Sequence, residues 1–245
     1  MTLLAASNIS KRYGGLMALT DVDFTVGSGE FVAVIGPNGA GKSTFLNVLT
    51  GLTPPSAGKV FLSGNDITQA YTHDRVRSGL GRTFQHGRLF TRLSVIENVM
   101  TGAAIRGKRG DRQLREDSLA ILASMGLSNV SDRPIGALSY GQRRMVELCR
   151  ALACQPKVLL LDEPAAGLNS GEVELLMQRL TALRERHELA VVLIEHNMGM
   201  VMRLAQRILV LNFGSKIAEG SPAEIQSNPA VLSAYLGEGY ANARD

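Results

Sequence analysis

Short apolar runs, separated by polar and glycine-rich stretches, dominate the pattern of the chain. Three of them, Phe31–Ile35, Val158–Leu161 and Ala190–Ile194, are almost entirely aliphatic and are flanked by polar positions. Continuous apolar runs of this length are typical of strands that are buried on both faces of a parallel sheet. The pattern therefore predicts a central, mainly parallel sheet and the α/β class.

Other stretches predict a second β layer and a helical region. The segment from Leu3 to Val26 is β-like and is interrupted by Gly14-Gly15, while Lys59–Leu62 is a further short strand. We expect these strands to form a small antiparallel layer. From about residue 86 to residue 155, β-branched runs are few and the apolar spacing is helical. A helical subdomain is expected there.

The C-terminal part predicts a hairpin followed by helices. Arg207–Gly220 alternates around a tight turn, and Pro222–Leu236 reads as a short helical tail. We expect one domain with a mixed-sheet core, an antiparallel β subdomain and a helical subdomain. Its expected parts are residues 1–85 and 156–220 for the core with its β layer, 86–155 for the helical subdomain and 221–245 for the tail.

A glycine-rich stretch directly after the first apolar run fits the phosphate-loop pattern G-x-x-x-x-G-K-[ST] without a mismatch. Its residues are Gly36, Pro37, Asn38, Gly39, Ala40, Gly41, Lys42, Ser43 and Thr44. A helical pattern opens at Ser43, and Gly51 can end it, so the order is strand, loop and helix. The alternative is an ordinary glycine-rich turn, but this order favours a P-loop NTPase fold that binds a nucleoside triphosphate.

The chemistry of phosphate binding explains these residue types. Glycines let successive backbone N–H groups point at phosphate oxygens, and the start of the helix adds the positive end of its dipole. Lys42 supplies a charge for the β- and γ-phosphates. The Ser43 hydroxyl is placed to coordinate the Mg²⁺ ion that accompanies the nucleotide.

Acidic residues and a histidine follow the other two apolar runs. Asp162 can hold magnesium directly or through water, and Glu163 can deprotonate the water that attacks the γ-phosphate. Ligands collect at strand ends in doubly wound sheets, so His196 can hydrogen-bond the γ-phosphate or the water. The alternatives are two surface acids after a core strand and a structural histidine.

Two further candidates stand near expected element ends. Gln85, at the junction with the helical region, could reach the magnesium ion or the attacking water in one arrangement and release it in another. Tyr13 could stack on the base of the nucleotide. Taken alone, Gln85 also suits an ordinary surface glutamine, and Tyr13 also suits a residue that packs within its strand. Both alternatives stay open.

A second anion site is predicted at another helix start. Ser139 can cap the helix that follows it, and Gly141 leaves room for a close approach. Because the chain already has a phosphate loop, the fitting ligand for this site is a phosphate held by another subunit.

Composition and charge exclude little. The chain has 245 residues, 45% of them hydrophobic, and a net charge of +4, which does not by itself argue for nucleic acid. Cys149 and Cys154 lack a metal-ligand cluster and are expected to be reduced packing residues. The basic run between Arg106 and Arg115 suits a solvated loop, with contact to anionic lipid as a second possibility.

No N-terminal segment has the pattern of a signal peptide, and no apolar run approaches the roughly 18 residues of a membrane-spanning helix. We therefore expect a protein that stays inside the cell. If it works at a membrane, another chain is expected to span that membrane.

Together these motifs resemble the ATP-binding subunit of an ABC transporter. Six family motifs stand in order over nearly the whole chain. They are an A-loop aromatic at Tyr13, Walker A at Gly36–Thr44, a Q-loop at Gln85, a signature at Leu138–Gln142, Walker B at Val158–Asp162 with Glu163, and the H-loop His196. Within the family, the stretches Arg82–Gln85, Leu93–Val99, Glu163–Asn169 and Asn228–Gly237 look like the ATPases of bacterial branched-chain amino acid importers.

This resemblance implies ATP and Mg²⁺ as cofactors and a pair of ATPase subunits that meet head to tail. In that pair, ATP on the loop around Lys42 is covered by Ser139, Gly141 and Gln142 of the other subunit. It also implies a two-part transmembrane permease fed by a periplasmic solute-binding protein, and no nucleic acid. The expected location is peripheral, on the cytoplasmic face of the bacterial inner membrane.

Three positions depart from the wider pattern. Tyr140 stands where the signature often has glycine, Asn169 stands at the D-loop position that is often Asp, and Asn197 follows the H-loop His where Asp is frequent. The open alternatives are the ATPase of a lipopolysaccharide-type exporter, a soluble ABC ATPase outside transport, and a nucleotide-binding module without turnover. The sequence itself names no solute.

Overall fold

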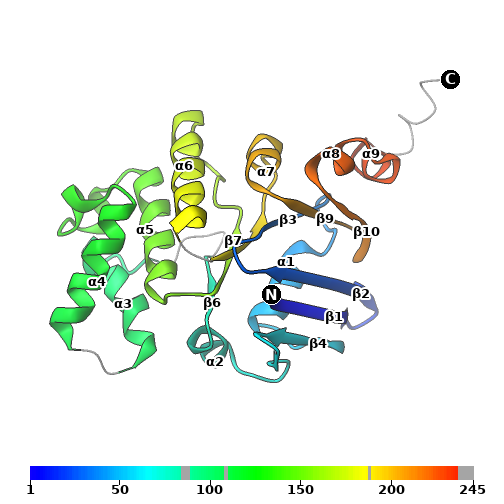
Figure 1. The fold of residues 1–245 in the computed structure, drawn as a ribbon, viewed down its shortest axis with the longest axis horizontal. Helices are drawn as coiled ribbons and strands as arrows, with labels where there is room; N and C mark the ends of the chain where they lie inside the picture. Colours follow the sequence, from blue (N-terminus) through cyan, green and yellow to red (C-terminus); the bar gives the residue numbers. More distant parts are fainter. Residues whose placement is uncertain (84–88, 108–109, 187–188, 237–245) are drawn as a thin grey trace.

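The computed structural model of the chain describes residues 1–83, 89–107, 110–186 and 189–236, which form two β-sheets with helices packed against them (Figure 1). The strands are β1 (Thr2–Tyr13), β2 (Leu16–Gly27), β3 (Phe31–Ile35), β4 (Ala57–Leu62), β5 (Asn65–Asp66), β6 (Leu80–Arg82), β7 (Val158–Asp162), β8 (Ala190–Ile194), β9 (Arg207–Asn212) and β10 (Ser215–Gly220). The longer helices are α1 (Lys42–Thr50), α3 (Val95–Ala103), α4 (Asp111–Ser124), α5 (Tyr140–Ala153), α6 (Ser170–Arg186) and α9 (Pro229–Leu236). The shorter helices are α2 (Thr72–Arg77), α7 (Met198–Leu204) and α8 (Pro222–Gln226), with single 3₁₀ turns at Ala104–Arg106, Ser128–Val130 and Ile135–Ala137.

The larger sheet has six strands in the order β10-β9-β3-β8-β7-β6, and all pairs except β10 with β9 are parallel. Every residue of β3, β7 and β8 is buried, as the continuous apolar runs predicted. The cause is that both faces are covered: Val32 and Val34 pack toward α1 and the smaller sheet, while Ala33 and Ile35 pack toward α7, α8 and α9. The predicted α/β fold with a mixed sheet is confirmed.

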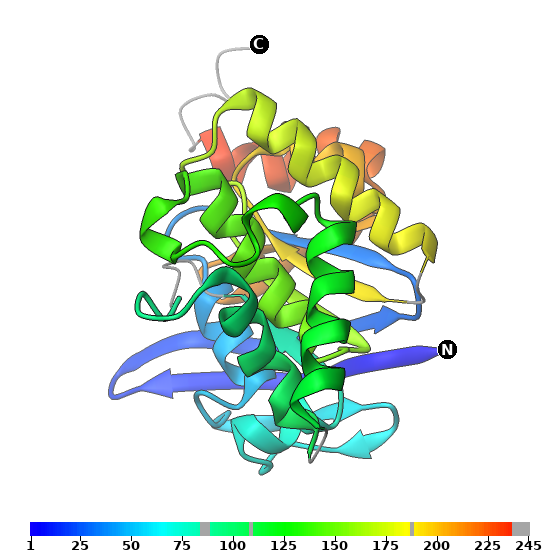
Figure 2. The ribbon, with the colours of Figure 1, turned by 90° about the vertical axis from the view of Figure 1, so that its left-hand side faces the viewer.

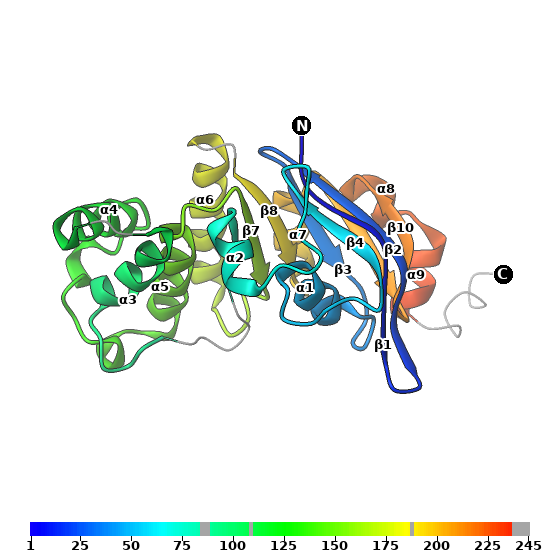
Figure 3. The ribbon, with the colours of Figure 1, turned by 90° about the horizontal axis from the view of Figure 1, so that it is seen from below.

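The smaller sheet has the order β2-β1-β4-β5 and is antiparallel throughout. β1 and β2 turn at Gly14-Gly15, and β4 pairs with β1, so the predicted antiparallel layer is confirmed. α1 joins the two sheets because Phe45, Leu46 and Leu49 belong to the core that both sheets share (Figure 3). The helix that follows the phosphate loop is thus held from two sides.

Helices α3, α4 and α5 gather at the end of the molecule away from the smaller sheet (Figures 1 and 2). Their apolar faces share one core with α6 and with Leu159 and Leu161 of β7. α3 and α5 each begin at a capping box, formed by Ser94 with Glu97 and by Ser139 with Gln142. The expected helices are present, while the boundaries of a helical subdomain at 86 and 155 stay a prediction.

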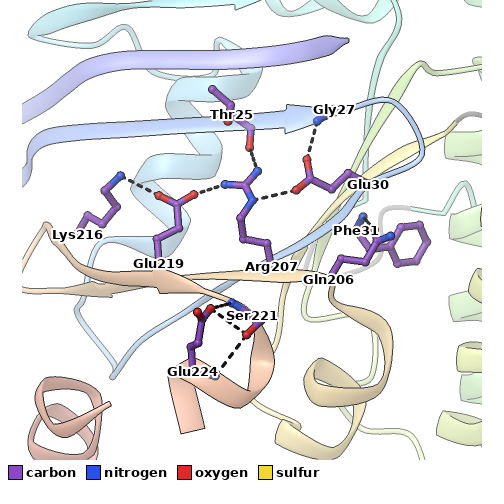
Figure 4. Close-up of polar contacts among 10 residues, drawn as sticks. All are labelled: Thr25, Gly27, Glu30, Phe31, Gln206, Arg207, Lys216, Glu219, Ser221 and Glu224. Carbon is purple, nitrogen blue, oxygen red and sulfur yellow. Dashed lines mark hydrogen bonds and ion pairs between the residues drawn. The ribbon is translucent and has the colours of Figure 1, made fainter. Parts of the chain in front are cut away.

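A polar network ties the C-terminal hairpin to the rest of the core (Figure 4). Arg207 of β9 donates to Glu30 at 2.9 Å, to the Thr25 carbonyl at 2.6 Å and to Glu219 of β10. Lys216 pairs with the same Glu219 at 2.8 Å. This partly buried network fixes the hairpin β9-β10 against β2, so the predicted hairpin is confirmed and has a defined position.

Two further expectations concern cysteines and membranes. Both cysteines are free thiols, and burial raises the pKa of the Cys149 thiol well above its usual range. An inert packing role for Cys149 follows from that burial. Within the four described stretches, no helix combines the length and the apolar character that crossing a membrane requires.

Candidate functional site: a nucleotide pocket at the sheet edge

Three of the predicted motifs follow neighbouring strands. β3 lies beside β8, and β8 lies beside β7, all parallel, so their carboxyl ends share one edge of the sheet. The phosphate loop follows β3, Glu163 follows β7 and His196 follows Glu195 at the end of β8. The topology therefore brings the phosphate loop together with Glu163 and His196, which follow it by more than 100 residues in the chain.

The phosphate loop requires glycine at positions where the backbone is left-handed and crowded. Gly41, the N-cap of α1, has φ of 101°, and a Cβ there would lie 2.7 Å from the Ala18 carbonyl oxygen. Gly36 has φ of 152°, and a Cβ there would overlap the carbonyl oxygen of Leu211. Gly36 is therefore held against the end of β9 and Gly41 against β2, which fixes both ends of the loop.

The start of α1 is prepared for an anion. Gly41 provides no side-chain cap, and no acidic residue stands in the first turn, so backbone N–H groups of that turn are open to a ligand. Lys42 is buried and its Nζ donates to the carbonyls of Gly36 at 2.7 Å and Pro37 at 3.0 Å. Desolvation lowers the pKa of Lys42, against the opposing charges of Glu163 and Asp162. A bound phosphate would compensate the positive charge of this buried ammonium group.

One cavity of about 390 Å³ is lined by the phosphate loop from Asn38 to Thr44, by Tyr13 and by Glu163 and His196. Tyr13 ends β1 with its ring partly exposed, and Lys11 lies 5.0 Å from the ring centroid. An exposed ring beside a phosphate-binding turn is positioned to stack on a base. The structure thus gathers the aromatic, phosphate-binding and acid–base candidates in one pocket.

Glu163 adopts a strained backbone conformation with φ of 47°. Its N–H donates to the Ile194 carbonyl at 2.9 Å, and its own carbonyl accepts from Ala166 N–H at 3.1 Å. The carboxylate, 19% exposed, faces His196 Nε2 at 3.2 Å. Such strain in a residue that the end of β8 holds in place points to a functional carboxylate.

Asp162 is buried, and its carboxylate pairs with Arg82 of β6 at 2.9 Å. Arg82 also donates to the side chains of Asn47 and Thr50 on α1. Among the described residues, no group of three or more His, Cys, Asp or Glu side chains could hold a metal ion. Mg²⁺ usually takes one or two protein ligands and completes its shell with phosphate and water. The exposed Ser43 hydroxyl fits a direct ligand and the paired Asp162 fits one acting through water.

The signature residues lie elsewhere. Of the residues that the structure describes, none from Ser139 to Gln142 lines the nucleotide cavity. Ser139 is exposed and caps α5, whereas Gly141 is buried, and a Cβ there would overlap the carboxylate of Glu172. The exposed Ser139 end of α5 is open to a ligand from outside this chain, and Gly141 has an intramolecular reason to lack a side chain.

The family model "ABC transporter" matches residues 19–166, more than half of the chain. The chain belongs to the ABC transporter ATPase family. A second model, "Branched-chain amino acid ATP-binding cassette transporter", matches residues 215–241. The high-affinity branched-chain amino acid transport ATP-binding protein BraF of Pseudomonas aeruginosa is 38% identical, with 96% of this chain and 98% of that protein covered. The lipopolysaccharide export system ATP-binding protein LptB of Haemophilus influenzae is 37% identical, with 97% and 98% covered.

Solved structures of the family agree with the fold. The ADP conformation of MJ1267, an ATP-binding cassette of an ABC transporter, has a TM-score of 0.89 at 32% identity and covers 97% of this chain and 100% of its own. A dimeric structure of MJ0796, a bacterial ABC transporter cassette, has a TM-score of 0.81 at 29% identity and covers 90% and 99%. The chain is therefore an ATPase with the ABC cassette fold.

Gln85, the Q-loop candidate of this ABC ATPase, lies outside the described residues. The two asparagines that depart from the family pattern both cap helices: the Asn169 side chain accepts from Glu172 N–H at 3.0 Å, and that of Asn197 accepts from Met200 N–H at 3.0 Å. An aspartate carboxylate could accept the same hydrogen bonds. The two asparagines therefore keep the helix-capping role at these positions but carry no negative charge.

Sequence reasoning missed two charged groups of this site, the nearly enclosed Arg82 and the buried Glu195. Arg82 was noted only as part of a resemblance, although it pairs with Asp162. Glu195 was noted only as the neighbour of His196, although its buried carboxylate accepts from the N–H groups of Ala165, His196 and Asn197 at 2.7 to 3.1 Å. The sequence signal that could have identified Glu195 is its place directly after a buried strand, because a buried carboxylate needs hydrogen-bond donors.

Phe213 is an exposed aromatic residue on the rim of the nucleotide cavity. It is 87% exposed and, with Gly214, forms the two-residue turn between β9 and β10, where both residues have positive φ. Such turns favour Asn-Gly.

We expect Phe213→Asn to raise the free energy of unfolding by about 1 kcal/mol, because Asn adopts this conformation more readily. Chemical denaturation measures it. Phe213→Ala keeps the backbone penalty and should bring no gain, and an equal gain in both variants would contradict the explanation.

Proposed function

We propose that the chain is the ATP-hydrolysing subunit of a bacterial ABC importer for branched-chain or related amino acids. The observation that carries this solute class is the match of residues 215–241 to the branched-chain amino acid cassette model. The similarity to BraF over nearly the whole length of both proteins supports it. The described lining of the site fits the nucleotide, so the solute class rests on the comparisons alone.

In the proposed mechanism, the phosphate loop and Lys42 hold the triphosphate while Tyr13 stacks on the adenine. Ser43, Gln85 and, through water, Asp162 would hold magnesium, which would neutralise charge on the β- and γ-phosphates. Residues on the other side of the cavity then act on the water.

Glu163 deprotonates the water that attacks the γ-phosphate, and His196 hydrogen-bonds the γ-phosphate. Their separation of 3.2 Å lets His196 hold the carboxylate near the nucleotide before the reaction. Gln85 senses the γ-phosphate at the start of the helical region. The places of Glu163 and His196 in the lining of one cavity support their proposed roles.

Two such subunits meet head to tail in our proposal. Ser139, Gly141 and Gln142 of one subunit cover the ATP that the other holds, so ATP joins the pair and hydrolysis releases it. The exposed start of α5, away from the lining of the chain's own nucleotide cavity, supports this arrangement. The dimeric cassette structure among the relatives is consistent with it. Both an identical partner and a sister ATPase are compatible with this geometry.

The proposed partners are a two-part permease and, through it, a periplasmic solute-binding protein, which place the chain on the cytoplasmic face of the inner membrane. A cleft of about 400 Å³ lies between β6 and α2 on one side and α3 and α5 on the other. Gln85 follows β6 by three positions in the sequence, so a permease segment seated there would contact the strand that precedes the proposed γ-phosphate sensor. Among its lining residues, Phe90 is exposed and Arg150 lies 5.7 Å from its ring.

The test is isolation of the protein from its native cells in mild detergent, with ATPase activity measured on the same sample. Recovery of a multi-spanning permease, with hydrolysis stimulated by a binding protein loaded with a branched-chain amino acid, is expected. The LptB similarity makes lipopolysaccharide-export partners the competing outcome. Their recovery, or recovery of ribosomes or DNA without a permease, would overturn the importer assignment.

Replacing Lys42 with Ala should weaken ATP binding by about 10- to 150-fold. The reason is the loss of charge-assisted hydrogen bonds to phosphate, which contribute about 1.5 to 3 kcal/mol each. Titration with a fluorescent ATP analogue measures the dissociation constant. Lys59→Ala, an exposed lysine on β4 that pairs only with Asp66 at 3.5 Å among the described residues, is the matched control and should leave ATP affinity unchanged. Equal affinities for wild type and Lys42→Ala would contradict the proposed role.

A further inference from the structure

The seven residues from Glu163 to Asn169 form a tight connection between β7 and α6. Ala166 N–H donates to the Glu163 carbonyl at 3.1 Å, and Leu168 N–H donates to the Ala165 carbonyl at 3.1 Å. The peptide of Ala166 is thus bonded directly to the residue that carries the proposed catalytic carboxylate. A force on Ala166 therefore acts on the strained backbone of Glu163.

Tyr140, the first residue of α5, contacts this connection from the signature side. Its hydroxyl donates to the Ala166 carbonyl at 3.1 Å. Its ring lies over Gly167, where φ is 78° and a Cβ would lie 2.9 Å from the ring. The guanidinium of Arg144, one helical turn later, lies 5.4 Å from the ring centroid. The ring is therefore confined between Gly167 and Arg144, and its hydroxyl is aimed at one backbone carbonyl.

A second contact anchors the far end of the same connection to α5. Glu172 accepts from Asn169 N–H at 3.1 Å, and its carboxylate packs over Gly141. On the side of the nucleotide pocket, Glu195 holds Ala165 N–H at 2.7 Å and borders His196. The connection is thus held by the signature helix on one side and by the strand end beside His196 on the other.

We propose that Tyr140 is a positioning residue that transmits occupation of the signature site to Glu163 of the same chain. When ATP of the other subunit seats against Ser139, the start of α5 is fixed, and Tyr140 then fixes Ala166 and, through it, Glu163. Each site becomes competent for hydrolysis once the other is filled. The inference rests on the proposed head-to-tail dimer but not on the identity of the solute.

The exposure of the contact explains why it responds to the second subunit. In the single chain Tyr140 is 50% exposed, so water competes for its hydrogen bond with Ala166. A subunit that covers Ser139 also covers the adjacent Tyr140 and excludes that water. Hydrogen bonds strengthen as the local dielectric falls, so closure tightens this one. A glycine at this position, frequent in the family's signature, would offer neither the ring nor the hydroxyl.

The test compares wild type, Tyr140→Phe and Tyr71→Phe as full-length proteins, each with its sister ATPase where the two co-purify. Tyr140→Phe keeps the ring and removes only the hydroxyl, whereas Tyr71, 74% exposed beside His73, is the matched control. ATP hydrolysis is measured over a range of ATP concentrations. We expect Tyr140→Phe to lower kcat about three- to tenfold, to leave KM within about twofold and to reduce the Hill coefficient toward 1.

Dimerisation is measured separately by size-exclusion chromatography with and without ATP. This measurement uses the Glu163→Gln variant, because it is expected to bind ATP without hydrolysing it at the normal rate. Adding Tyr140→Phe should leave ATP-dependent dimerisation within about twofold, because the residues that touch the nucleotide are unchanged. A wild-type Hill coefficient of 1, an unchanged Hill coefficient in Tyr140→Phe, or a parallel loss of dimerisation would each overturn the transmission. Absence of any ATP-dependent dimer of Glu163→Gln would refute the head-to-tail arrangement and the transmission with it, while ATP hydrolysis by wild type would still stand.

Discussion

Replacing Glu163 with Gln is expected to lower kcat for ATP hydrolysis by about 10²- to 10⁴-fold while ATP binding persists. Gln keeps the size of the side chain and can still accept a hydrogen bond from His196, which faces Glu163 at 3.2 Å. It cannot take a proton from the attacking water. The measurement is the hydrolysis rate at saturating ATP, together with binding of a fluorescent ATP analogue.

A matched variant separates this effect from the general loss of a carboxylate. Glu116 is an exposed glutamate of α4 that pairs with Arg112 at 2.9 Å, and Glu116→Gln should leave the rate unchanged. Glu163 has a left-handed backbone conformation, which costs Glu and Gln the same free energy. The backbone therefore does not contribute to the difference in rate between wild type and Glu163→Gln. A normal rate in Glu163→Gln would show that another group is the base.

The elements around the site could be predicted because they carry local patterns. β3, β7 and β8 are continuous apolar runs, and the structure covers both of their faces, which is the condition that produces such runs. The phosphate loop is a continuous motif whose glycines all have positive φ, and Gly36 and Gly41 also lie where a side chain would clash. A parallel sheet then placed the ends of these strands at one edge, so the meeting of Lys42, Glu163 and His196 followed from topology.

The ties between these elements could not be predicted, because each joins side chains that are remote in the chain. Arg82 and Asp162 are 80 residues apart, Glu195 and Ala165 are 30 apart, and Tyr140 and Ala166 are 26 apart. Periodicity indicates which face of an element is buried but not which polar group will meet it there. Tyr140 was noticed only as a departure from a family pattern, and its partner became visible only in the fold.

Replacing Arg82 with Met should lower the free energy of unfolding by about 3 to 5 kcal/mol. Arg82 and Asp162 are both nearly enclosed, with side-chain exposures of 10% and 7%, and their charges are 2.9 Å apart. Methionine is of similar length but leaves the Asp162 carboxylate buried without its counter-charge, which is the costly arrangement. Chemical denaturation without nucleotide measures the loss, and a decrease below about 1 kcal/mol would contradict it.

The matched comparison is the double variant Arg82→Met with Asp162→Asn. Removing both charges takes away the uncompensated carboxylate, so the double variant should be clearly more stable than the sum of the two single losses predicts. Part of the loss will remain, because Arg82 also donates to Asn47 and Thr50 at 2.8 and 3.0 Å. Strict additivity would show that the two charges do not stabilise one another.

Since Asp162 is proposed to hold magnesium through water, Mg²⁺ with ATP should stabilise Arg82→Met more than wild type, because the ion supplies the positive charge that the variant has lost. An equal stabilisation would instead place the magnesium ion away from Asp162.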